Sequence, residues 1–206
     1  MGDFVIFGAG GRAGRTAVAE ARRRGHRVTA VVRDPSRYAG PSGDGVRVAA
    51  GDVTDAAAVA ALAAGHDAAI NAAAVLEPDT FFADAAHALV RGLPKAGVGR
   101  LVAVGLASLL PDADGTRLLD LPGFPAEFRP FCLGHAAGLD VLRDAALDWV
   151  YVSPAGDFDH GGPRTGRYGI RAHGDPAARI SYADFALVLL DEAETPRHRG
   201  VHLAVS

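Results

Sequence analysis

Three features of the sequence predict an α/β fold with a doubly wound parallel sheet. Short runs rich in β-forming residues alternate with alanine-rich stretches typical of helices. Several of these short runs are continuously apolar, as strands covered on both faces are. A glycine-rich segment, Gly8–Gly14, follows the first run, where a strand should turn into a helix. The 206 residues suffice for one sizeable core, so we expect a single domain over residues 1–206.

The expected elements follow one another in the order that a parallel sheet requires. The predicted strands are Asp3–Phe7, Arg27–Val32, Val46–Ala50, Ala68–Asn71, Arg100–Val104, Trp149–Val152 and Val201–Val205. The predicted helices are Arg12–Arg24, Asp55–Ala64, Asp79–Ala96, Gly134–Ala146 and Arg179–Glu194, the last entered near Ser181. Thr54 is a candidate N-cap of the second helix. The residues that should end helices in a left-handed conformation are Gly25, Gly65 and Gly97.

Composition narrows the classes of partner. The formal net charge of -3 argues against a nucleic-acid partner. The single cysteine, Cys132, excludes an internal disulfide and a cysteine-rich zinc site. The histidines show no metal-ligand spacing, so no metal is expected. No apolar run is long enough to span a membrane and no signal segment is apparent, so we expect a cytoplasmic protein. We expect it to be a monomer or a homodimer.

The segment GAGGRAG fits two phosphate-binding registers. Gly8, Gly10 and Ala13 match G-x-G-x-x-G/A, whereas Gly8, Gly11 and Gly14 match G-x-x-G-x-x-G. Both registers serve the same purpose: a tight turn leads into a helix whose N-terminus faces a pyrophosphate, with no Cβ in the way. The position between a predicted strand and a predicted helix makes this a strong signal of a Rossmann-type dinucleotide site.

Further stretches extend this match over nearly the whole chain, in order. They are VVRDPSR at 31–37, GDVTD at 51–55, HDAAINAAA at 66–74, LVAVGLASL at 101–109, LPGFPAEFRP at 121–130, LDWVYVSPA at 147–155 and RISYADFA at 179–186. With the glycine segment, they make the chain resemble an atypical short-chain dehydrogenase/reductase of the NmrA-like, NAD(P)H-binding branch, which favours the second register. The resemblance is stronger still to NADH-flavin reductase-like and biliverdin reductase B-like proteins.

The resemblance implies cofactor roles for particular residues. Those expected to line the pyrophosphate are Gly8, Gly11, Arg12, Ala13 and Gly14. Asp52 and Val53 would flank the adenine. Ala72, Ala73 and Ala74 would follow the ribose and pyrophosphate, and Ser153, Pro154 and Ala155 would close over the nicotinamide. Core packing explains the alanines equally well, and a turn role explains Asp52.

The end of the second strand bears on the choice of dinucleotide. An NAD-preferring site often places an acidic residue there, to bond the ribose 2′-hydroxyl. Here Arg33 holds that place and Asp34 leads into a proline turn. An arginine can pair with a 2′-phosphate, and Arg12 and Arg37 offer further charge. We therefore favour NADPH; NADH is the alternative if Asp34 takes the hydroxyl.

The usual catalytic pair of short-chain dehydrogenases is missing. No tyrosine is followed four residues later by a lysine, and Lys95 is the only lysine in the chain. The remaining candidates are Ser108 and His135, which aligns with a histidine of the biliverdin reductase B-like pattern. A histidine suits acid catalysis near neutral pH. Helix packing for His135 and a turn role for Ser108 are the alternatives.

The missing acid favours an acceptor that needs no proton from the protein. We expect an NAD(P)H-dependent reductase of a flavin, quinone or similar aromatic or conjugated small molecule. Residues 106–130 and 153–178 should cover the substrate. An apolar floor could come from Leu106, Leu109, Leu110, Phe124, Phe128, Phe131 and Phe158, although core packing suits most of them better. A dinucleotide sensor without turnover and a tailoring enzyme with a non-redox step are the competing functions.

Overall fold

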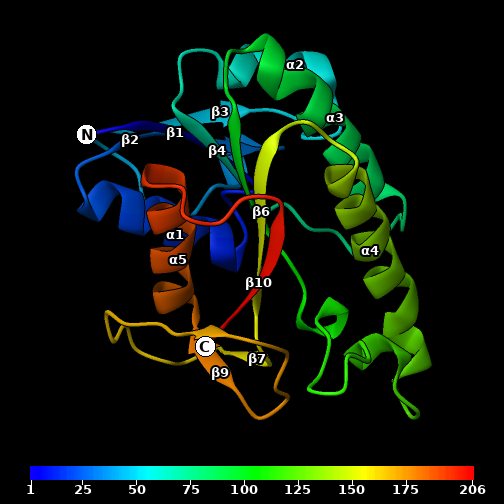
Figure 1. Cartoon of the computed structure of the whole chain (residues 1–206). Coiled ribbons are helices and arrows are strands. Elements are labelled where there is room, and N and C mark those ends of the chain that lie inside the picture. The colour runs from blue at the N-terminus through cyan, green and yellow to red at the C-terminus, as the bar shows by residue number, and fades with distance from the viewer.

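A computed structural model describes residues 1–206 and places eight strands in one sheet (Figure 1). Its strand order is β3-β2-β1-β4-β5-β6-β10-β8. The strands are β1 Asp3–Phe7, β2 Arg27–Val32, β3 Val46–Ala50, β4 Ala68–Asn71, β5 Arg100–Val104, β6 Asp148–Pro154, β8 Ile170–Arg171 and β10 Val201–Val205. Every pairing is parallel except that of β8 with β10. The order reverses between β1 and β4, which confirms the predicted doubly wound, Rossmann-type sheet.

Five helices cover both faces of the sheet. They are α1 Arg12–Arg23, α2 Ala56–Ala63, α3 Phe81–Lys95, α4 Arg129–Arg143 and α5 Tyr182–Glu194. Figure 1 shows α1 and α5 on one side of the sheet, with α3 and α4 on the other. Alternate residues of β1 face two different cores. Phe4 and Ile6 pack with α1 and α5, whereas Val5 and Phe7 pack with α2, α3 and α4. Burial on both faces explains why this strand has no polar alternation.

Most expected elements have the predicted bounds, and the deviations have local causes. α4 begins at Arg129 rather than at Gly134, because the 3₁₀ turn Ala126–Phe128 runs directly into it and Pro130 suits a first turn. α5 begins at Tyr182 rather than at Arg179. The residues before it, Arg179–Ser181, form β9, which pairs in parallel with β7, Asp157–Asp159.

Helix ends show one wrong assignment. Asp55, not Thr54, caps α2, and its carboxylate accepts hydrogen bonds from the amides of Ala57 and Ala58. Ser181 caps α5 as expected, through its hydroxyl and the amide of Asp184. The three glycines predicted to end helices adopt positive φ angles, of 80° at Gly25, 77° at Gly65 and 77° at Gly97.

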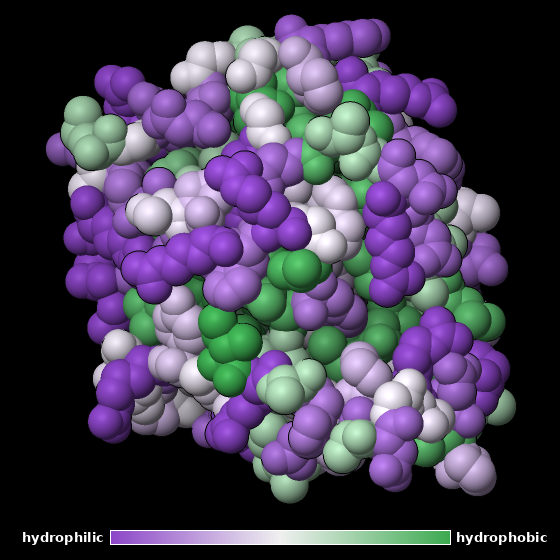
Figure 2. All heavy atoms as spheres, viewed as in Figure 1, coloured by the Kyte–Doolittle hydropathy of each residue, from purple (hydrophilic) through white to green (hydrophobic).

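The long segment between β5 and α4 is packed against the protein. Its 3₁₀ turns bury Leu109, Leu110 and Leu119, and Arg129 donates a hydrogen bond to the carbonyl of Leu119. Hydrophilic side chains dominate the face shown in Figure 2, with hydrophobic patches across its middle and lower parts. None of the helices combines the length and apolarity needed to cross a membrane.

Gly14 tests how tightly α1 docks on the glycine loop. A Cβ at this position would collide with the carbonyl oxygen of Gly8 and the Cα of Ala9, and both obstacles are backbone atoms. We expect Gly14→Ala to lower the free energy of unfolding by about 1–3 kcal/mol, the usual cost of overpacking, despite the better helix propensity of alanine. Urea denaturation measures the change.

Gly99→Ala is the matched control, because nothing lies within 4 Å of its added Cβ. That variant should be as stable as the wild type or slightly more stable. Equal stability of the two variants would contradict the close approach of α1 to the loop.

Candidate functional site

One large pocket, of about 980 Å³, opens at the carboxyl ends of the parallel strands. Its walls come from the segments that follow β1, β2, β3, β4 and β5, together with the starts of α3 and α5 and one face of α4. Ligands of doubly wound sheets bind at this edge, next to the point where the strand order reverses. The lining includes Gly8, Gly11, Arg12, Ala13, Arg33, Asp34, Arg37, Tyr38, Asp52, Val53, Ala72, Ala73, Ala74, Phe81, Gly105, Leu106, Phe131, His135, Phe158 and Tyr182.

The glycine loop is shaped by backbone contacts. Gly8 has a φ of +73°, and a Cβ there would collide with the backbone of Ala72 and Ala73. Gly14 presses against Gly8 in the same way. At Gly11, by contrast, which lines the pocket, a Cβ would make only ordinary contacts, with the oxygens of Gly8 at 3.4 Å and of Ala72 at 4.0 Å. The structure thus gives each glycine of the G-x-x-G-x-x-G register a distinct place.

The start of α1 suits a phosphate group. Gly11 is the N-cap residue and offers no side chain, and the first turn carries no acidic residue. The free N–H groups and the positive end of the helix dipole therefore face the pocket beside Gly11, Arg12 and Ala13. A cradle that a Cβ at Gly11 would fill, beside unpaired amides, fits a pyrophosphate.

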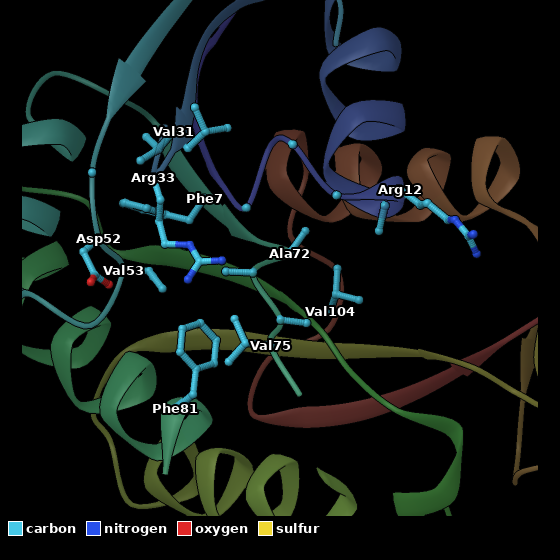
Figure 3. Close-up of a pocket in the computed structure, with 18 of the residues that line it drawn as sticks. Phe7, Arg12, Val31, Arg33, Asp52, Val53, Ala72, Val75, Phe81 and Val104 are labelled. Atoms are coloured by element: carbon cyan, nitrogen blue, oxygen red, sulfur yellow. The ribbon is translucent and has the colours of Figure 1, made fainter. Parts of the chain in front are cut away.

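Two arginines line the pocket in the segment that follows β2. Figure 3 shows the Arg33 guanidinium reaching into the pocket, with Asp52 at its edge. Arg33 and Arg37 are exposed and form no ion pair. The Asp52 carboxylate lies close enough to Arg33, and the Asp34 carboxylate close enough to Arg37, for Coulomb attraction, but neither arginine is held in a direct ion pair.

The two acidic residues here are engaged with their own backbone. The Asp34 carboxylate accepts hydrogen bonds from the amide and hydroxyl of Ser36, at 3.0 and 2.6 Å, which lower its pKa. The Asp52 carboxylate accepts from the amide and hydroxyl of Thr54, at 2.9 and 2.8 Å, and these bonds lower its pKa in the same way. Both side chains serve as turn caps.

Arg12 points away from this charged end. In Figure 3 its side chain extends on the far side of the glycine loop from Arg33. Its Nη1 lies 2.7 Å from Nδ1 of His160. His160 follows β7, and the adjacent Phe158 lines the pocket in a stack against Tyr182, with ring centroids 4.0 Å apart. Arg12 therefore links the glycine loop to the segment after β6.

His135 lines the pocket from α4 and is only 5% exposed. Its ring stacks on Phe82, with centroids 3.7 Å apart, and meets the edge of Phe131. Its Nδ1 lies 2.7 Å from the phenol oxygen of Tyr151. Burial lowers the pKa of His135 to about 3, so the imidazole is neutral near pH 7. A neutral histidine at that pH cannot serve as the protonated acid suggested by sequence.

Several predicted site residues lie outside the pocket. Ser108 bonds to the Sγ of Cys132, at 3.2 Å. Ser153 is fully buried, 2.7 Å from Nε2 of His202. Pro154 and Ala155 are buried in and beside β6, and Ala155 pairs with the backbone of β10. Gly14 is buried under the loop. None of these residues lines the pocket.

The predicted covering segments contribute little surface to the pocket. Residues 106–130 supply only Leu106 and residues 153–178 only Phe158. Of the other suggested floor residues, Phe131 lines the pocket, Leu109 and Leu110 are in the core, and Phe128 is 55% exposed away from it.

Sequence reasoning overlooked three aromatic residues of the wall, Tyr38, Phe81 and Tyr182. Phe81 and Tyr182 are the first residues of α3 and α5. In a doubly wound fold the helices start near the ligand edge of the sheet, so this position was the available signal. Tyr38 lies in the turn after β2, where no pattern singles it out.

Comparison with known proteins agrees with this geometry. Residues 8–196 match a family described as NAD(P)H-binding. The chain belongs to this family. It is 36% identical to the uncharacterized protein YwnB of Bacillus subtilis, over 97% of this chain and 96% of YwnB. A candidate NADH-flavin reductase from Streptococcus pneumoniae has a similar structure, with a TM-score of 0.82 and 33% identity over 100% of this chain and 99% of the other. A candidate epimerase from Bacteroides thetaiotaomicron gives a TM-score of 0.88 and 32% identity over 100% and 96%.

Family membership makes a nicotinamide dinucleotide the cofactor class of this chain. Together with the reductase neighbour, it supports the general class of NAD(P)H-dependent oxidoreductases. When bound, such a cofactor supplies or accepts a hydride.

Gly11 offers a direct test of the cradle. Gly11→Val should leave the fold intact, because the residue is exposed and its φ of -75° is open to any side chain. The branched side chain should block the pyrophosphate and weaken dinucleotide binding at least about 10-fold. Isothermal calorimetry with NADPH and a thermal melt of the same sample measure both effects. Wild-type affinity in the folded variant would rule out this loop as the binding site.

Proposed function

We propose that this protein is an NADPH-dependent reductase that passes a hydride to a flavin, a quinone or a similar planar conjugated molecule. The observation that carries the proposal is the pocket itself. One cavity joins a dinucleotide cradle to an aromatic wall whose only imidazole, that of His135, is neutral and buried. Hydride transfer to an electron-poor ring needs positioning and no proton from the protein.

The choice of NADPH rests on the charges after β2. Arg33 and Arg37 line the pocket without ion-pair partners, and a 2′-phosphate would satisfy them. The ribose 2′-hydroxyl of NADH would need a carboxylate oxygen, and Oδ2 of Asp34 is the alternative partner there, because the turn uses only Oδ1. We favour NADPH because a 2′-phosphate can pair with both guanidinium groups, which the hydroxyl of NADH cannot do.

The aromatic wall supports a flat acceptor. Phe81 and Phe131 come from the helices on one side of the pocket, and the stacked Phe158 and Tyr182 come from the other side. Leu106 lies between them, after β5. Rings of this kind stack on planar molecules and exclude water from the hydride path. The candidate NADH-flavin reductase among the similar structures agrees with such an acceptor.

Arg33 should set the preference between the two dinucleotides. We expect Arg33→Ala to weaken NADPH binding by about 1–3 kcal/mol, the range for a lost charge-assisted bond, and to leave NADH nearly unchanged. Calorimetric titration of both dinucleotides measures the difference.

Arg91→Ala is the control, because Arg91 is exposed on α3, outside the pocket, and its loss changes the net charge equally. It should affect neither dinucleotide. Equal losses for NADPH and NADH in Arg33→Ala would contradict the assignment of Arg33 to the 2′-phosphate.

Turnover itself separates a reductase from a sensor. When the protein is mixed anaerobically with NADPH and either FMN or menadione, NADPH should be oxidised. The loss of absorbance of the reduced nicotinamide measures the reaction. Tight NADPH binding with no oxidation by either acceptor would instead favour a dinucleotide sensor, or a non-redox step such as that of an epimerase.

A further inference from the structure

His135 and Tyr151 form a hydrogen-bonded pair at the wall of the pocket. Tyr151 lies on β6 and is buried, with its ring against the backbone of Gly105. Gly105 and His135 both line the pocket, so the phenol sits directly behind the pocket wall. Its only hydrogen-bond partner is Nδ1 of His135, at 2.7 Å.

Counting donors decides which atom carries the proton. A buried phenol whose O–H finds no acceptor costs about 1–3 kcal/mol. If Nδ1 donated to the phenol oxygen, the O–H of Tyr151 would be left without an acceptor, because no other acceptor is in reach. If the phenol donates to Nδ1, its hydrogen is used and the imidazole proton moves to Nε2. The second arrangement leaves no buried donor unpaired.

Nε2 of His135 has no partner within the protein. No fully buried side-chain nitrogen or oxygen in the structure lacks a hydrogen bond, so Nε2 keeps some exposed surface. The pocket that His135 lines is the open space to which we assign that surface. The stack on Phe82 and the edge contact with Phe131 fix the plane of the ring. The direction of the Nε2–H bond is therefore fixed as well.

We propose that Tyr151 is a positioning residue that holds His135 as the Nε2–H tautomer, and that this N–H donates a hydrogen bond to a carbonyl oxygen or ring nitrogen of the hydride acceptor. The proposal rests on the proposed reductase function and narrows its substrate class. The preferred acceptor is a conjugated ring whose carbonyl or imine is in conjugation with the carbon or nitrogen that receives the hydride.

The role of His135 is electrostatic. The hydride supplied by NAD(P)H carries two electrons to the acceptor, the nicotinamide is oxidised, and negative charge develops on the conjugated carbonyl oxygen. The fixed Nε2–H stabilises that charge where it forms, as an oxyanion donor does. His135 keeps its proton, and water supplies the proton that completes the reduced acceptor.

The titratable groups near the imidazole agree with a neutral donor. Tyr151 on β6 is kept protonated by burial, which raises its pKa. Burial lowers the pKa of His202, on β10, to about 4, and raises that of the Cys132 thiol, on α4. All three groups are uncharged near pH 7, so hydride transfer should not vary with pH between about pH 5.5 and pH 8.5.

Two acceptors separate this role from simple packing. Menadione has carbonyl oxygens, whereas N-methylacridinium accepts a hydride but offers neither a carbonyl nor a free ring lone pair. We expect His135→Phe to slow single-turnover hydride transfer to menadione by about 10- to 100-fold and to change transfer to N-methylacridinium by less than about twofold. His135→Gln, which retains a neutral N–H, should recover part of the menadione rate.

Tyr151→Phe tests whether Tyr151 positions His135. Its menadione rate should fall by about 3- to 10-fold, the scale of one neutral hydrogen bond. Nitrogen-15 spectra of the histidines in the free wild-type protein should show the proton of His135 on Nε2, and Tyr151→Phe should show a mixture of tautomers.

Three results would overturn the proposal. They are a proton on Nδ1 in the wild type, equal losses with both acceptors in His135→Phe, and a rate that falls with rising pH in the wild type but not in His135→Phe. Failure of the wild type to oxidise NADPH with either acceptor would overturn both the reductase function and the hydrogen bond from His135 to the acceptor. The nitrogen-15 spectrum judges the tautomer independently of turnover.

Discussion

The close approach of three backbone segments at Gly8 is the contact on which the site depends. The turn after β1, the residues after β4 and the first turn of α1 meet there with no room for a side chain. Gly8 takes a positive φ so that the chain can turn, and Gly14 lets α1 lie against that turn. This arrangement aims the N-terminus of α1 along the edge of the sheet, so the remaining walls of the pocket are built around it.

Electrostatics then divides the pocket into two ends. One end has the N-terminus of α1 and two arginines without a direct ion-pair partner, and we propose that it binds the phosphates of the dinucleotide. The nearby carboxylates cap their own turns through one oxygen each. The capping bonds lower the pKa of Asp34 and Asp52, so both carboxylates stay ionised beside the two arginines. The proposed preference for NADPH therefore rests on the two arginines, whose guanidinium groups have no direct ion-pair partner.

The other end has little charge, and its chemistry follows from burial. His135, Tyr151 and His202 are all polar, yet their surroundings keep each of them neutral near pH 7. A neutral imidazole with a fixed ring can donate a hydrogen bond but cannot act as the protonated acid. We therefore propose that desolvation makes this histidine an oriented hydrogen-bond donor and not a protonated acid.

The sequence by itself determined the order of the elements, the sheet type and the glycine loop. Continuous apolar runs, helix-ending glycines and the segment Gly8–Gly14 act locally, so their patterns can be read without knowing what they touch. The tertiary structure decided which side chains reach the pocket. It moved Ser153, Pro154 and Ala155 behind the wall, added Phe81 and Tyr182 to it, and placed Tyr151 beside His135 across 16 residues of chain. Strand register and helix docking set these contacts, and no spacing in the sequence records them.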